Sequence, residues 1–289
     1  MRFDQATIPL RPRSTANCLD LALVFARVHL RLVLTCWAIV AVPCCIGVYL
    51  AVDRWGATLN LAMVVFFLAT SVLGTLITCG AAGAVFGEPL RLQHLRDPQT
   101  RRELIWLLLK VFVLRLATGV GLMFLLLPGI RIAVQWGFIV EQAALSRMSH
   151  HLHDRRVAKL LHGQLGDLAM RGLAISVFCG LLWGVLFLTL DQASGFLLGF
   201  PILLGRLPLG EGTLETYFES ALDLEYYIVQ GFLWSDPRVV TALLAVALLV
   251  YPLGRLAWFF CYIDLRVRRD CWDMELQMVQ EAERLRGAV

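Results

Sequence analysis

Six long runs of apolar residues constrain the fold of this chain more than any other feature of its sequence. An α-helix rises 1.5 Å per residue, so about 20 apolar residues in succession are needed to cross about 30 Å of hydrocarbon. The runs have about this length: Leu32–Val52, Leu59–Phe86, Leu104–Leu127, Ile130–Met148, Leu173–Leu190 and Val239–Tyr262. The sequence therefore predicts an all-α fold, a polytopic transmembrane helical bundle of about six spans.

The composition excludes most other classes of protein. Hydrophobic residues make up 58% of the 289 residues and charged residues 17%, against about 45–50% and about a quarter in soluble domains. This rules out a soluble globular enzyme, a disordered chain, collagen, a coiled coil and a disulfide-rich miniprotein. No repeat or low-complexity linker divides the sequence, so we expect a single integral membrane domain over residues 1–289.

The cysteines and the N-terminus add two further expectations. The eight Cys lie mostly inside or beside the apolar runs and show no CxxC spacing, which is typical of small apolar core residues rather than of disulfides or a zinc site. The N-terminus carries charges and two prolines where a signal peptide needs an apolar segment, so the first span is expected to be retained. We predict no metal and no cofactor.

Basic residues predict the orientation, because Lys and Arg are retained on the cytoplasmic side of short loops. The predicted outer segments hold few of them. The predicted inner segments hold most of them: Arg2, Arg11, Arg13, Arg27, Arg31, Arg91, Arg96, Arg101, Arg102, Arg147, Arg155, Arg156, Lys159, Arg171, Arg266, Arg268, Arg269, Arg284 and Arg286. We therefore predict a multi-pass protein of the inner membrane with both termini in the cytoplasm. No basic stripe interleaved with aromatic residues indicates nucleic-acid binding.

Polar residues inside the spans are the main candidates for a functional site. The third and fourth spans form a hairpin about a Pro128–Gly129 turn, and counting outward from that turn places Arg115 beside Glu141 and Gln142. A charge at this depth is costly unless it is paired or hydrated, so we predict an Arg115–Glu141 pair. The pair has two interpretations. It is either an ionisable site on a polar path, with Gln135 nearby, or a contact that fixes the register of the hairpin, unless Arg115 extends to the interface instead.

Arg255 is the other charge inside a span, and it follows a Pro and a Gly that loosen the helix. The favoured interpretation is an anchor that reaches the headgroups with the help of Trp258; a buried polar role is the alternative.

Three polar segments outside the spans are expected to form surfaces. In the inner loop, His150, His151 and His153 precede a helix with one apolar and one basic face, which indicates contact with anionic lipid more than a metal site. On the outer side, an acidic stripe recurs every four residues and predicts an interfacial helix. Its members are Glu211, Glu215, Glu219 and Asp223. Residues 195–209 are either a loop or a short re-entrant segment, and the tail 264–289 is long enough to bind a protein partner.

Small residues predict close helix contacts. Gly80, Gly83 and Gly87 fall on about one face, and Gly180 and Gly184 form a GxxxG motif. In lipid such faces let helix backbones approach one another. We favour packing within the chain over a dimer.

Three short segments resemble one family of bacterial membrane proteins. They are Arg11-Pro12-Arg13-Ser14 with Leu19-Asp20 near the start, Leu127-Pro128-Gly129-Ile130 with Trp136 in the middle, and Tyr262-Ile263-Asp264-Leu265-Arg266-Val267-Arg268-Arg269 near the end. In order and placement they are similar to the glycerophosphoryl diester phosphodiesterase membrane-domain type. The resemblance implies a six-helix module without the catalytic domain that names the group, so it transfers no catalytic residue. The outer segment 191–237 is longer and more acidic than this group implies.

Function is the least constrained expectation. No nucleophile elbow, P-loop or HExxH motif is present, so we predict a non-enzymatic inner-membrane scaffold or accessory subunit. Its cytoplasmic surfaces at 87–103, 148–171 and 264–289 would engage lipid and protein partners. The alternative is a transporter or channel for a small solute or lipid that uses Arg115 and Glu141.

Overall fold

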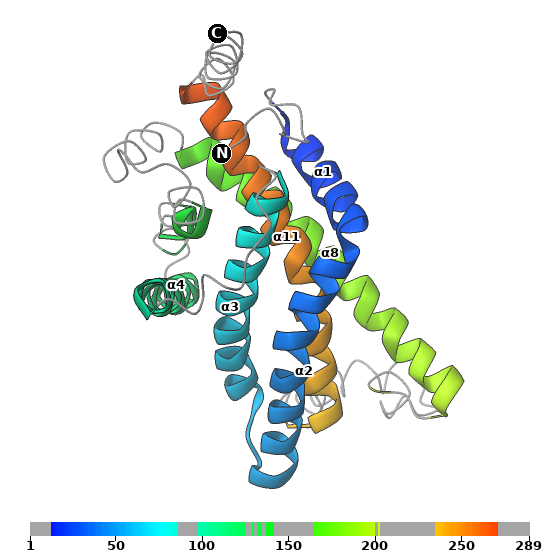
Figure 1. The fold of residues 1–289 in the computed structure, drawn as a ribbon. Coiled ribbons are helices and arrows are strands. Elements are labelled where there is room, and N and C mark those ends of the chain that lie inside the picture. The colour runs from blue at the N-terminus through cyan, green and yellow to red at the C-terminus, as the bar shows by residue number, and fades with distance from the viewer. Residues whose placement is uncertain are drawn as a thin grey trace, which may run out of the picture. The chain divides into compact units, whose positions relative to one another are not determined.

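The computed structural model describes residues 13–85, 98–124, 129, 132–134, 137–141, 165–199, 202 and 235–270, and over these residues the chain forms helices and no strand. Six principal helices follow in order along the chain (Figure 1). They are α1 (Thr15–Val28), α2 (Leu30–Trp55), α3 (Leu59–Val85), α4 (Pro98–Phe124), α8 (Leu165–Leu198) and α11 (Pro237–Asp270).

Four of these helices, α2, α3, α8 and α11, are long and apolar enough to cross a membrane. They contain the predicted runs 32–52, 59–86, 173–190 and 239–262, except for Phe86, which lies outside the described residues. The expectation of a membrane protein is therefore supported at this coarser level. α4 covers most of the predicted run 104–127 as a helix, and only fragments of the run 130–148 are described. Six spans remain a prediction.

Two helices extend well beyond the apolar runs that predicted them. α8 begins eight residues before Leu173 and α11 continues eight residues past Tyr262. The added turns carry i,i+4 ion pairs, Asp167 with Arg171 and Asp264 with Arg268. Such pairs support a helix after its apolar face has ended, so hydropathy alone underestimated both helices.

The contacts of the chain divide it into two compact units that alternate along the sequence. The first, the Arg-rich unit, comprises residues 1–36, 71–178 and 252–289, and the second comprises residues 37–70 and 179–251. Each of the four long apolar helices contributes residues to both units. The expected single domain stays a prediction.

The second unit packs α8 against α11. Phe187 of α8 forms a core with Val239, Ala242 and Val246 of α11. The indole N–H of Trp183 donates to the carbonyl oxygen of Leu243 at 3.3 Å. An indole that satisfies its only donor on a neighbouring helix fixes both the depth and the rotation of that contact.

The Arg-rich unit packs α1 along the C-terminal part of α11. Cys18, Ala22, Phe25 and Ala26 form the buried face of α1, and the ring of Phe25 meets the ring of Phe260 edge-on, with centroids 5.8 Å apart. Ser14 caps α1, since its hydroxyl accepts a hydrogen bond from the amide of Asn17. The opposite side of α1 leaves Val24 and Val28 exposed.

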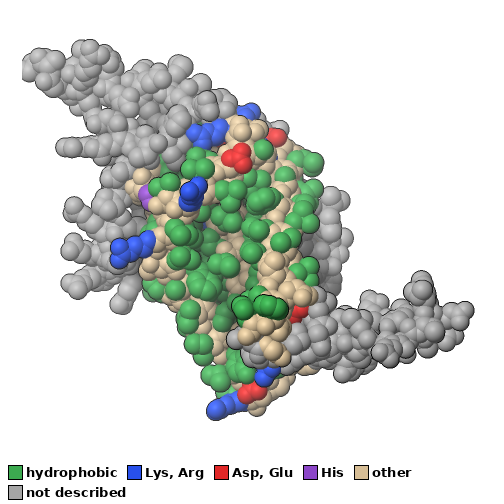
Figure 2. All heavy atoms as spheres, turned by 90° about the vertical axis from the view of Figure 1, so that its right-hand side faces the viewer, with side chains coloured by type: hydrophobic (Ala, Val, Ile, Leu, Met, Phe, Trp, Pro, Cys, Tyr) green, Lys and Arg blue, Asp and Glu red, His purple; other side chains and the backbone are tan. Residues whose placement is uncertain are grey.

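Much of the protein surface is apolar. Figure 2 shows hydrophobic side chains spread widely over the face in view. Among the four long apolar helices, α3 and α11 have 50% and 56% of their most apolar stretch buried, whereas α2 and α8 have 17% and 11%. Exposed aliphatic side chains on α2 and α8 are compatible with contact to lipid or to another helix.

Candidate functional site

Two buried carboxylates dominate the polar chemistry of the Arg-rich unit. Asp264 lies on α11 near the end of the helix, and Glu141 lies in the short apolar helix Ile132–Glu141. Both side chains are almost fully buried, with 1% and 0% of their surface exposed. Burying a carboxylate is costly unless it is paired and hydrogen-bonded. The cations and hydrogen-bond donors around each carboxylate therefore determine how stable its ionised form is.

The first carboxylate, Asp264, is the centre of what we call the inner anchor, formed by Arg13, Asp167, Arg171, Asp264 and Arg268. Its Oδ2 accepts from Nη1 of Arg171 on α8 at 2.7 Å. Its Oδ1 accepts from Nε of Arg268 at 3.1 Å and from the backbone amide of Arg13 at 2.5 Å. Both oxygens are therefore hydrogen-bonded, and the carboxylate joins three segments that are far apart in sequence.

The cations of the inner anchor have further partners. Nε of Arg171 donates to Asp167 at 3.0 Å, and Nη2 of Arg268 donates to the carbonyl oxygen of Arg13 at 2.6 Å. The backbone of Arg13 is thus held through both its amide and its carbonyl, just before the cap of α1. The anchor fixes the start of α1 against the start of α8 and the C-terminal part of α11.

The thiols of Cys18 and Cys261 meet beside the anchor. Both residues are fully buried, and a hydrogen bond from Cys261 lowers the pKa of Cys18 against the opposing effect of burial. The contact is a second link between α1 and α11.

The second carboxylate, Glu141, has a different environment, which we call the Glu141 site: Thr78, Arg115, Gly137, Glu141 and Arg255. Oε1 of Glu141 lies 2.7 Å from Nη2 of Arg255. The geometry is not that of a hydrogen bond, and among the residues that the structure describes neither carboxylate oxygen has a hydrogen-bond partner. The pair is a close ion contact of poor hydrogen-bond geometry, in a place where well-aligned hydrogen bonds would be worth most.

Arg255 is fixed by other groups of the same unit. Its Nε donates to the hydroxyl oxygen of Thr78 on α3 at 3.0 Å, and its Nη1 donates to the carbonyl oxygen of Gly137 at 3.4 Å. Only 8% of the side chain is exposed. The favoured expectation, an anchor reaching the headgroups, therefore does not describe Arg255, because its guanidinium is turned into the protein.

Aromatic packing positions the segment that carries Glu141. The indole of Trp258 stacks on the ring of Phe138 at 4.7 Å with an angle of 13° between the planes, and Tyr262 contacts the same ring at 5.1 Å. Trp258 also lies against Gly137 and Gly172, where a Cβ atom would approach the indole to 3.1 and 3.3 Å. Trp258 thus packs beneath the Glu141 site rather than assisting Arg255 at an interface.

The expected partner of Glu141 was Arg115, and the structure pairs the carboxylate with Arg255 instead. Arg115 is close enough to act electrostatically on Glu141, so counting residues from the turn identified the right neighbourhood. It could not identify the ion-pair partner, because depth along a helix does not determine which neighbouring helix its side chains face.

The remaining sequence candidates fall into two groups. Gly80 and Gly83 are buried, in keeping with close packing. At Gly180 and Gly184 an added Cβ would meet nothing within 4 Å among the described residues, so the expected internal packing is not observed there. The rest lie outside the described residues: Gln135, Gln142, Gly87, His150, His151, His153, Glu211, Glu215, Glu219, Asp223, residues 203–209 and the tail from 271.

Sequence reasoning missed the inner anchor. It treated Arg171, Arg268 and Arg13 as basic residues of inner segments and quoted Asp264 only as part of a family resemblance. The signal was present: Asp264 is the sole acid between the last apolar run and a basic cluster, four residues before Arg268. The structure also brings together two of the segments that carry the resemblance, at Arg13 and at Asp264.

Comparisons with known proteins leave the family open: no family model, no curated protein and no solved structure matches this chain. The resemblance to the glycerophosphoryl diester phosphodiesterase membrane-domain type therefore stays a prediction.

Proposed function

We propose that this chain is a multi-pass protein of a bacterial inner membrane that serves as a non-enzymatic scaffold or accessory subunit. The inner anchor is the observation that carries the proposal. Its charges hold α1, α8 and α11 together and thereby fix a basic surface at one end of the Arg-rich unit. Buried charges used in this way specify an arrangement of helices rather than a reaction.

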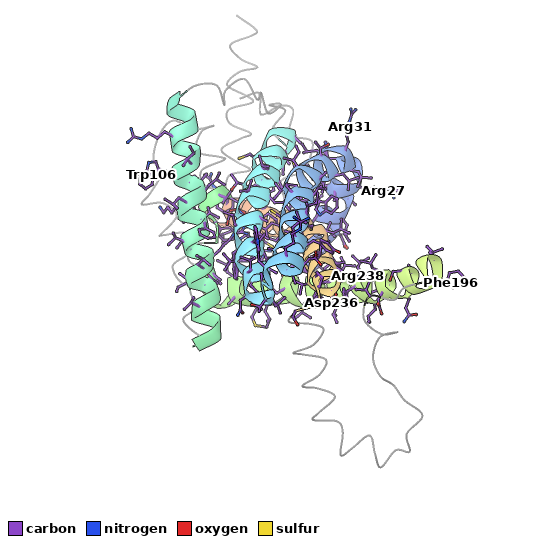
Figure 3. All side chains as sticks on the ribbon, turned by 90° about the horizontal axis from the view of Figure 1, so that it is seen from below. Arg27, Arg31, Trp106, Phe196, Asp236 and Arg238 are labelled. Atoms are coloured by element: carbon purple, nitrogen blue, oxygen red, sulfur yellow. The ribbon has the colours of Figure 1, made fainter. Side chains whose placement is uncertain are left out.

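The surface around α1 supports contact with lipid on the cytoplasmic side. Arg27 and Arg31 are exposed, and Figure 3 shows both side chains directed away from the helices. They lie among exposed aliphatic residues, Val24, Val28 and Leu30. Arginine beside exposed apolar side chains suits the headgroup region of a membrane with anionic lipid.

Exposed aromatic residues fit the same placement. Trp106 projects from α4 with 62% of its surface exposed, and Phe196 projects near the end of α8 with 90% exposed (Figure 3). Tryptophan in particular is enriched at membrane–water interfaces. We propose six spans, interfacial amphipathic helices and both termini in the cytoplasm. Residues 87–103, 148–171 and 264–289 then provide the surface for a protein partner.

The scaffold proposal is tested by crosslinking intact cells and purifying the full chain in mild detergent. We expect a reproducible partner protein whose crosslinks map to 87–103, 148–171 or 264–289. Recovery of the isolated monomer alone would contradict a scaffold. Reporter fusions at both termini test the topology separately, with a reporter enzyme that is active only in the periplasm. Activity of this reporter at either terminus would contradict the proposed orientation.

A transporter or channel is the second candidate, and the Glu141 site favours it. Intramembrane ionisable residues often mark solute or proton pathways, and Glu141 has two cations nearby but no well-aligned hydrogen bond to a described residue. Replacing Arg115 with Leu should abolish uptake by a transporter while leaving partner capture by a scaffold intact. If reconstituted vesicles take up solute equally well with the wild-type chain and with Arg115→Leu, the site has no role in transport.

A further inference from the structure

The Glu141 site holds a charge that its surroundings stabilise incompletely. Glu141 is fully buried, and neither of its oxygens accepts a hydrogen bond of good geometry from the described residues. The equally buried Asp264, in the same unit, accepts from Arg171, Arg268 and the amide of Arg13. A buried carboxylate kept permanently ionised needs hydrogen bonds of this kind, so the two acids are equipped for different states.

In the part of the chain that the structure describes, the charged groups that act on Glu141 come from two helices. Arg255 of α11 makes the 2.7 Å contact, and Arg115 of α4 acts from farther away. The third polar neighbour, Thr78 of α3, binds Arg255 and is not titratable. Both cations stabilise the ionised carboxylate, whereas burial without a hydrogen bond from the described residues destabilises it.

Arg255 does not depend on Glu141 alone. When Glu141 becomes neutral, Nε of Arg255 keeps the hydroxyl of Thr78 and Nη1 keeps the carbonyl of Gly137. The guanidinium thus retains two acceptors, whereas a proton on Asp264 would occupy an oxygen that already accepts a hydrogen bond, either from Arg171 or from Arg268 and the amide of Arg13. The cost of neutralising the acid is therefore lower at Glu141.

We propose that Glu141 is a proton-binding site within the membrane-spanning part of the protein, with Arg255 as the counter-charge of its ionised form. A proton from water adds to a carboxylate oxygen and gives a neutral acid, while the positive charge stays on Arg255, which keeps Thr78 and Gly137. Loss of the proton restores the ion pair. The site rests on the proposed insertion in a membrane but on neither a transport activity nor a partner.

The test is an infrared titration of the full chain in lipid vesicles. Spectra are recorded as the pH is lowered from about 9 to about 4, the range over which buried glutamates titrate. Wild type should gain the carbonyl band of a protonated acid reversibly, and Glu141→Gln should lack that component. Asp167→Asn, which removes an exposed acid, is the matched control and should keep it. Identical titrations of wild type and Glu141→Gln would overturn the proposal.

A second variant keeps the test decisive if Glu141→Gln fails to fold. Arg255→Gln removes the counter-charge, so at a given pH the ratio of protonated to ionised Glu141 should rise about tenfold or more. An unchanged titration of the band would show that it does not belong to this pair. The reporter fusions separate the two failures, because a chain that does not insert contradicts the proposed function, whereas an inserted chain without the band contradicts only the proton site.

Discussion

Asp264 and Glu141 are two acids of the same compact unit, equally hidden from solvent and each paired with arginine, yet their carboxylates are bonded in different ways. Asp264 has hydrogen bonds on both oxygens and joins three segments. With the described residues, Glu141 makes one close ion contact and no well-aligned hydrogen bond. The difference indicates that burial and pairing alone do not define a role. The number and geometry of hydrogen bonds separate a fixed structural charge from one that can change.

The largest effect is expected from breaking the inner anchor. Asp264→Asn removes the buried charge that compensates Arg171 and leaves that buried arginine only the exposed Asp167, and breaking a buried ion pair in this way costs about 3–5 kcal/mol. The free energy of unfolding in mixed detergent micelles measures this loss. Asp167→Asn is the control: that acid pairs with the same Arg171 but is 57% exposed, so we expect about 0–1 kcal/mol. Equal losses would contradict the anchor.

A smaller effect is expected from disturbing the packing beneath the Glu141 site. In Gly137→Ala the new Cβ would lie 2.5 Å from the carbonyl oxygen of Ala133 and 3.1 Å from the indole of Trp258. Overpacking of this kind costs about 1–3 kcal/mol. Gly180→Ala is the control, since its Cβ meets nothing within 4 Å, and helix propensity should make it neutral or stabilising. Chemical unfolding measures both losses, and the tryptophan fluorescence of the folded protein should shift in Gly137→Ala because the new Cβ displaces the indole of Trp258. Unchanged fluorescence and stability in Gly137→Ala would argue against the contact.

Neutralising Glu141 sharpens the comparison. Glu141→Gln keeps the size of the side chain and leaves Arg255 bound to Thr78 and Gly137, so we expect a loss of about 1–2 kcal/mol, which is smaller than that of Asp264→Asn. Chemical unfolding of both variants under the same conditions measures the difference. If Glu141→Gln lowers the free energy of unfolding more than Asp264→Asn does, then Glu141 is the fixed structural charge and the roles given to the two acids are wrong.

The smallest effect is expected where the anchor meets water. Ser14 caps α1 next to Arg13, and its hydroxyl accepts from the amide of Asn17 at 3.3 Å in an exposed position. Ser14→Ala should cost about 1 kcal/mol or less, visible as a small drop in thermal stability. A loss as large as that of Asp264→Asn would mean that the start of α1, rather than Asp264, holds the anchor together.

Hydropathy predicted the four long apolar helices because the length of an apolar run is a local property. It did not predict where α8 begins or where α11 ends, because the first turns of α8 carry the Asp167–Arg171 pair and the last turns of α11 carry the Asp264–Arg268 pair instead of a continuous apolar run. The charges inside the apolar runs drew attention to Glu141, Arg115 and Arg255, but the sequence predicted an Arg115–Glu141 pair and a headgroup anchor for Arg255, whereas the structure pairs Glu141 with Arg255. Pairing depends on how the helices rotate against one another, and side chains such as Trp258 and Phe138 determine that rotation.

Carbodiimide labelling compares the two acids in one sample and tests the central claim most directly. A hydrophobic carbodiimide reacts with protonated carboxyl groups in apolar surroundings, and peptide mass spectrometry of the full chain in vesicles reports the modified position. The account predicts labelling of Glu141 that increases as the pH falls, with Asp264 unmodified while the protein stays folded. Labelling of Asp264 in preference to Glu141 would contradict it.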